Sequence, residues 1–102
     1  MAVVTVATFT IKPDRMEDYL ENTRKAKAIF EKFGARNCRL LSAVVAGEAT
    51  GSLAFIAESD DFAAQSALRE KAMADPEMPR TVNTSAGPIA SAHVAIWVDI
   101  PL

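Results

Sequence analysis

The chain has 102 residues, a formal net charge of −2 and a pI of about 5.3, and half of its residues are hydrophobic. This length predicts a single domain over residues 1–102. The acidic balance argues against nucleic acid as a partner, because such binding depends on neutralising phosphates. The single cysteine, Cys38, excludes an internal disulfide and is expected to be a small buried apolar side chain.

The first expected element is a strand over Val3–Lys12, which is rich in β-branched residues. It lacks a basic leader and a cleavage signal, so we expect no signal peptide and a cytoplasmic protein. A helix should follow Pro13, and Asp14 and Glu17 have the spacing of a capping box, which makes Asp14 the expected N-cap. Gly34 is placed to end this helix. The apolar residues that recur at helical spacing are Met16, Tyr19, Leu20, Thr23, Ala26, Phe30 and Phe33.

Two strands, Asn37–Ala46 and Ser52–Glu58, are expected to form a hairpin, because glycines bracket the short loop between them. A second helix should begin at a cap formed by Ser59 or Asp60, with Asp61 in its first turn. The sequence after this helix predicts a loop over Thr81–Pro88. The looser apolar face of the helix consists of Phe62, Ala63, Ser66, Leu68, Ala72 and Met73.

The last expected strand, Ile89–Ile100, has no polar face. Alternation places Val94, Ile96 and Val98 on one side and His93, Ala95 and Trp97 on the other. A small antiparallel sheet normally has polar residues on its solvent side. The uncharged stretch before and within this strand contains too many polar residues to be a membrane span.

The predicted order is therefore βαββαβ, an α+β ferredoxin-like sandwich with a four-stranded antiparallel sheet and both helices on one face. The helices can cover only one face of the sheet. We therefore expect the other face to pack against a second copy of the chain, in a homodimer formed through the sheet faces.

Three segments resemble a known family: K-P-D-R-M-E-D-Y-L at Lys12–Leu20, F-G-A-R-N-C-R-L-L at Phe33–Leu41, and A-D-P-E at Ala74–Glu77. They are similar to the dimeric α/β-barrel superfamily, within it to the NIPSNAP-like and uncharacterised branches, and the resemblance spans nearly the whole chain. It implies a homodimer whose two sheets close into a barrel, with a pocket between sheet and helices. The superfamily's activities range from cofactor-independent monooxygenases and isomerases to members with no known reaction.

The residues themselves offer few candidates for chemistry. His93 is the only histidine and a weak candidate for a general base. We expect a pocket, if present, to draw on Phe9, Tyr19, His93 and Trp97. One histidine and one cysteine give no metal-ligand spacing, so neither a metal nor a cofactor is expected.

Two function classes stay open. The first is a protein that binds a small apolar or aromatic molecule without turning it over. The alternative is a cofactor-independent monooxygenase or isomerase of the antibiotic-biosynthesis-monooxygenase type.

Overall fold

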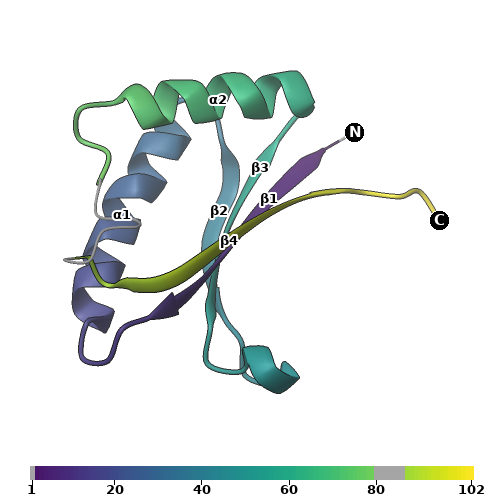
Figure 1. Cartoon of the computed structure of the whole chain (residues 1–102). Helices are drawn as coiled ribbons and strands as arrows, with labels where there is room; N and C mark the ends of the chain where they lie inside the picture. Colours follow the sequence, from purple (N-terminus) through teal and green to yellow (C-terminus); the bar gives the residue numbers. More distant parts are fainter. Residues whose placement is uncertain (1, 80–86) are drawn as a thin grey trace.

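The computed structural model describes residues 2–79 and 87–102, and its elements follow the predicted βαββαβ order (Figure 1). The loop predicted over Thr81–Pro88 lies outside the described residues except for its last two positions. The elements are β1 (Val3–Ile11), α1 (Met16–Lys32), β2 (Arg36–Ser42), the short 3-10 turn η1 (Gly47–Ala49), β3 (Leu53–Ser59), α2 (Phe62–Ala74) and β4 (Ile89–Val98).

The strands form one antiparallel sheet in the order β2-β3-β1-β4, and both helices lie against the same face of it (Figure 1). This arrangement confirms the predicted ferredoxin-like sandwich. Because side chains alternate along a strand, Thr5, Ala7 and Phe9 of the central strand β1 point toward the helices. Val4 and Val6 point to the other side, which we call the outer face.

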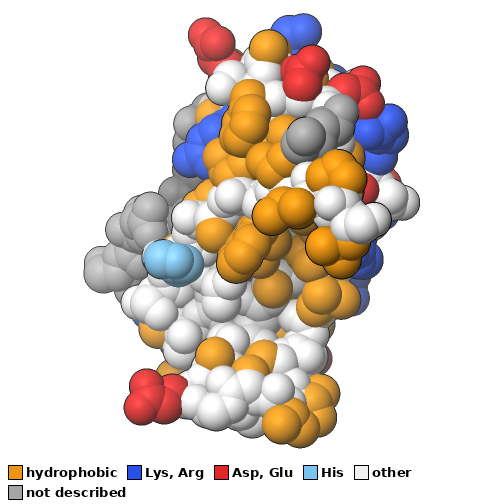
Figure 2. Space-filling model, turned by 90° about the vertical axis from the view of Figure 1, so that its right-hand side faces the viewer, with side chains coloured by type: hydrophobic (Ala, Val, Ile, Leu, Met, Phe, Trp, Pro, Cys, Tyr) orange, Lys and Arg blue, Asp and Glu red, His pale blue; other side chains and the backbone are white. Residues whose placement is uncertain are grey.

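The outer face carries apolar side chains from all four strands, and Figure 2 shows them gathered on it. Trp97 is 63% exposed and Leu41 is 45% exposed, whereas Ile56, between its neighbouring strands, is 7% exposed. An ion pair between Arg39 and Glu58 (3.4 Å) also lies on this face. The register assigns to it the apolar residues Val4, Val6, Leu41, Ala54, Ile56, Ala95 and Trp97.

The start of α1 differs from the prediction. Its N-cap is Arg15, without a side-chain cap, and Asp14 lies one residue earlier with φ 61°. The reason is a tight turn in which the Arg15 amide donates to the Lys12 carbonyl oxygen at 3.2 Å. In this turn Pro13 takes the second position and Asp14 the third, where a type II turn requires a positive φ. Asp14 is therefore a turn residue and does not cap the helix.

The other helix ends are closer to expectation. Gly34 follows the last turn of α1 with φ 106°, and its amide and that of Ala35 donate back to Glu31 and Phe30 in a Schellman motif. In α2 the cap is Asp61, whose Oδ1 accepts the Ala64 amide at 2.7 Å. The predicted caps, Ser59 and Asp60, were one or two residues too early. Ser59 is the last residue of β3, and the Asp60 carboxylate pairs with Arg36 at 2.7 Å, so Asp61 is the residue that caps the helix.

The β2–β3 hairpin forms as predicted, with Gly51 donating to the Ala43 carbonyl oxygen at 2.9 Å. β2 nevertheless ends at Ser42, four residues earlier than expected, because the chain leaves the ladder through η1. Val44 and Val45, predicted to lie in the strand, are 77% and 94% exposed in the loop.

The core lies between the helices and the inner face of the sheet, and Cys38 is buried in it as predicted. α1 contributes Tyr19 and Ile29, while Met16 at its start is exposed. α2 buries only part of its predicted face. Leu68 and Ala72 are buried as predicted, together with Gln65, whereas Phe62 is 57% exposed.

Candidate functional site

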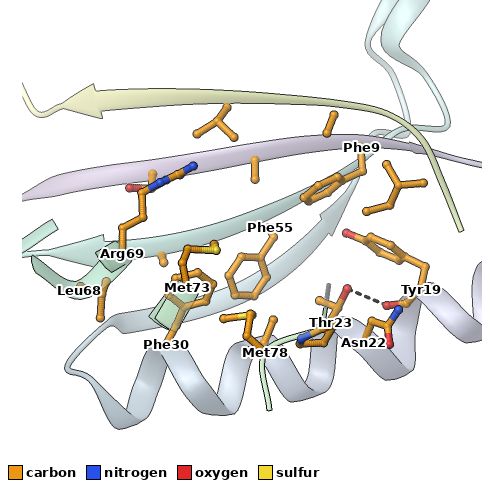
Figure 3. A pocket seen from close by; sticks show the side chains of 18 of the residues that line it. Phe9, Tyr19, Asn22, Thr23, Phe30, Phe55, Leu68, Arg69, Met73 and Met78 are labelled. Atoms are coloured by element: carbon orange, nitrogen blue, oxygen red, sulfur yellow. Dashed lines mark hydrogen bonds between the residues drawn. The ribbon is translucent and has the colours of Figure 1, made fainter. Parts of the chain in front are cut away.

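A cavity of about 590 Å³ lies between the helices and the inner face of the sheet (Figure 3). All of the major elements except β2 contribute to it, and its walls are mostly apolar. The lining residues are Thr5, Ala7, Phe9, Tyr19, Asn22, Thr23, Ala26, Phe30, Phe55, Ala57, Gln65, Leu68, Arg69, Met73, Met78, Pro79, Pro88, Ile89, Ala92 and Val94.

The cavity is hollow because small residues form part of its floor. Ala7 of β1 is paired with Phe55 of β3 on one side and with Val94 of β4 on the other. Ala57 and Ala92 continue the same inner face along those two strands. Large rings from Phe9 and Phe55 rise beside these alanines, so the helices rest on the rings and leave space above the small side chains.

Tyr19 projects from α1 into the core and is 2% exposed. Its ring packs on Phe9 with the ring centres 5.5 Å apart and the planes at 57°. Its hydroxyl is oriented into the cavity (Figure 3), and no described residue accepts or donates a hydrogen bond to it. The neighbouring Thr23 hydroxyl donates to the Tyr19 carbonyl oxygen at 2.8 Å.

Burial raises the pKa of the Tyr19 hydroxyl above its ordinary value of 10.0. The phenol is therefore protonated at neutral pH and available as a hydrogen-bond donor. A buried hydroxyl without a partner costs about 1–3 kcal/mol. An acceptor atom placed in the cavity by a ligand would remove that cost.

α2 supplies polar groups at another part of the cavity. Gln65 is 6% exposed and faces the core. Arg69, one helical turn later, extends its side chain over the cavity (Figure 3). Among the described lining residues it is the only one with a formal charge.

The structure separates the four residues that the sequence placed in one pocket. Phe9 and Tyr19 both line the cavity and contact each other. His93 and Trp97 lie on the outer face, because they pair with Thr8 and Val4 of β1, which also point away from the helices. Both are exposed in the single chain. A shared site of His93 with Tyr19 is thus ruled out within one chain, since the sheet lies between them.

Sequence reasoning missed Arg69, Gln65 and the floor of alanines. The available signal was helical spacing: Gln65, Leu68 and Ala72 follow one another at intervals of three and four residues, and Arg69 borders that stripe. The predicted face of α2 correctly included Leu68 and Ala72, but it also included the exposed Phe62 and omitted Gln65. The alanines of the cavity floor could not be recognised from the sequence. A small residue in a strand leaves a cavity only if the side chains packed around it do not fill the space, and those neighbours are known only from the structure.

Two further properties concern the described residues only. No group of three or more histidine, cysteine, aspartate or glutamate side chains in residues 2–79 and 87–102 is arranged to hold a metal ion. Within the same ranges no helix has the length and apolar character needed to cross a membrane.

Neither a family model nor a curated protein matches this chain. Solved structures do match it over nearly its full length. A NIPSNAP domain protein from Burkholderia xenovorans is 21% identical, with 96% of this chain and 94% of that chain covered and a TM-score of 0.71. A NIPSNAP family protein from Agrobacterium tumefaciens is 16% identical, with 98% and 94% covered and a TM-score of 0.76.

An antibiotic biosynthesis monooxygenase is also similar, with 20% identity, 97% of this chain and 99% of that chain covered, and a TM-score of 0.68. Identities this low establish a shared fold and nothing more specific. The chain therefore has the ferredoxin-like fold of NIPSNAP-like proteins, as its sequence segments suggested. Its activity must be argued from its own cavity.

Proposed function

We propose that this protein binds a small apolar or aromatic molecule in the cavity between its helices and its sheet. The observation that carries the proposal is a cavity of about 590 Å³ whose mostly apolar wall contains a buried, unpartnered Tyr19 hydroxyl. Small-molecule sites typically have volumes of about 300–1,000 Å³ and apolar walls with a few placed polar groups. The proposed site of action is the cytoplasm.

Binding without turnover is the reading that the cavity favours. The alternative, a cofactor-independent monooxygenase or isomerase, calls for a group that takes a proton from the substrate. No described residue that lines the cavity is a carboxylate or an imidazole. Tyr19 is held protonated by its burial, so it is suited to donate a hydrogen bond and poorly suited to accept a proton.

The proposed functional unit is a homodimer formed through the outer face. The support is the run of apolar side chains across all four strands of that face, with Trp97 63% exposed in the single chain. Monomeric proteins rarely leave an apolar patch of several hundred Å² uncovered. Two such sheets pack face to face at about 10 Å. In this dimer the cavities would lie on the far sides of the two sheets, away from the contact.

Binding is tested with a neutral probe, naphthalenemethanol, by isothermal titration calorimetry on the native protein and on Ala7→Leu. Leucine at this position on the cavity floor fills space that the probe needs, so we expect affinity to fall about tenfold or more. Ala28→Leu is the control, because Ala28 is exposed on α1 and does not line the cavity. Equal binding by native protein and Ala7→Leu, or no binding of any probe, would refute the proposal.

A further inference from the structure

The described residues that line the cavity carry positive charge and no negative charge. Arg69 is the only charged residue among its described lining residues, and no carboxylate lines the wall beside it. None of the ion pairs found among the described residues involves Arg69. The net charge of the whole chain is −2, so long-range attraction does not bring anions to this protein. Among the described residues, Arg69 is the cation that is placed to recognise an anion here.

Arg69 and the Tyr19 hydroxyl lie toward opposite ends of the cavity (Figure 3). Tyr19 packs on Phe9 at one end. Leu68, the neighbour of Arg69 in α2, packs in the cluster that contains Ala57, and Ala57 is paired with Thr5. Phe9 and Thr5 are four residues apart in β1, which corresponds to about 13 Å along the strand. The two polar groups are thus separated by a mostly apolar stretch of the cavity, long enough to hold a two-ring aromatic molecule with a polar substituent at each end.

We propose that the ligand is an apolar carboxylate that also carries a hydrogen-bond-accepting oxygen at its far end. Its carboxylate lies at Arg69 and its far oxygen accepts the Tyr19 hydroxyl, with the apolar body between Phe9, Phe55 and the alanine floor. The proposal rests on the binding function proposed above and narrows its ligand class. A guanidinium presents paired N–H donors that match a carboxylate, and such charge-assisted bonds are stronger than neutral ones.

The carboxylate is tested with naphthoate against the neutral naphthalenemethanol, using calorimetry because the only tryptophan, Trp97, lies across the sheet from the cavity. Native protein should bind naphthoate more tightly. Arg69→Gln should weaken naphthoate binding by about tenfold and change naphthalenemethanol binding by less than about twofold. Lys71→Gln is the matched control: it removes the same charge from the same helix but does not line the cavity.

The far oxygen is tested with a hydroxynaphthoate and with the methylnaphthoate that has its methyl group at the same ring position. Tyr19→Phe should weaken the hydroxynaphthoate by about fivefold and leave the methylnaphthoate unchanged. The ligand-free Tyr19→Phe protein should melt in urea at the same concentration as native protein or higher, since the hydroxyl it loses has no described partner. A purely structural role for Tyr19 would give the opposite: lower stability and equal loss of both ligands.

The outcomes separate this inference from the broader function. If naphthalenemethanol binds in the cavity but naphthoate binds no better, and Arg69→Gln changes neither, the carboxylate inference is wrong while the binding function stands. If neither probe binds, the proposed binding function is wrong, and the carboxylate inference is wrong with it. If Lys71→Gln weakens naphthoate as much as Arg69→Gln does, the anion is held by general charge and the assignment to Arg69 is overturned.

Discussion

Asp14 and Asp61 each precede a helix, and their backbone conformations give them different tasks. Asp61 is extended and its carboxylate accepts the Ala64 amide at 2.7 Å, so Asp61→Ala should lower the free energy of unfolding by about 1 kcal/mol.

Asp14 has φ 61°, which glycine adopts more easily than aspartate does. Asp14→Gly should therefore stabilise the protein by about 0.5 kcal/mol. Urea melts at matched protein concentration measure both. A small loss of stability in Asp14→Gly, in place of the expected gain, would restore Asp14 as a cap, because glycine caps a helix only slightly less well than aspartate does.

Asp75 gives the protein a pH dependence that follows from two hydrogen bonds to its carboxylate. Lys32 at the end of α1 donates to its Oδ2 at 2.8 Å and the Glu77 amide donates to its Oδ1, and these bonds hold the pKa of Asp75 below its ordinary value of 3.8. When folding lowers the pKa of a carboxyl group, that group stabilises the native state at pH values above its pKa in the unfolded chain. That stabilisation is lost as the pH falls through the folded value. Asp75→Asn should thus flatten the fall in stability below about pH 4.

The lysine that lowers this pKa can be tested separately. Lys32→Met removes the first cause of the shift, so the pKa of Asp75 in the folded state should move toward its ordinary value and the variant should lose less stability below about pH 4 than native protein does. Lys25→Met is the control, because Lys25 on the same helix pairs only with the exposed Glu21 at 4.0 Å. Urea melts between about pH 6 and pH 2 supply the data. Equal acid transitions in both variants would show that the Lys32–Asp75 bond does not form in solution.

At the scale of elements, α2 provides the sharpest contrast between sequence and structure. Leu68 is buried against Phe55 and Ala57, so Leu68→Ala should cost about 2–4 kcal/mol. Phe62, the largest apolar residue of the helix, is 57% exposed, and Phe62→Ser should cost less than about 1 kcal/mol. Chemical denaturation of the two variants measures both losses. A larger loss in Phe62→Ser would mean that Phe62 is packed in the core, as the sequence predicted.

The strands and α1 were predictable because their periodicity is strong. In β1 and β4, large β-branched or aromatic residues recur at alternate positions. The order of the elements is then compatible with only a few fold topologies. α2 is weakly amphipathic and rich in alanine, so its predicted face included the exposed Phe62 and omitted the buried Gln65. The site was harder to predict than the fold, because it is formed by contacts between segments that are distant in the sequence. Tyr19 and Phe9 were found because aromatic residues stand out in the sequence, whereas Arg69 resembled any other charged residue on a helix.

At the scale of the whole molecule, β4 is an edge strand that is exposed on both faces in the single chain. Val94 and Ile96 on its inner face are 47% and 45% exposed, because the strand order places β4 at the sheet edge farthest from β2 and β3, which pack against the helices. Trp97 on its outer face is 63% exposed. The sequence indicated that this strand has no polar face, and the structure adds that the chain's own helices do not cover it. The same strand therefore borders the cavity on one side and the proposed dimer contact on the other.

The dimer makes a prediction that is independent of any ligand. Light scattering at micromolar concentration should give about twice the chain mass of 11.0 kDa. Trp97→Lys places a charge in the proposed contact, where an unpaired buried charge is costly, and should yield a folded monomer, because Trp97 lies outside the core of the single chain. Phe62→Lys adds the same charge at a similarly exposed apolar residue on α2, so it should remain a dimer. The cavity does not use the outer face, so the Trp97→Lys monomer should still bind naphthalenemethanol. A native protein that is monomeric under these conditions, or a Trp97→Lys variant that remains dimeric, would contradict the outer-face dimer.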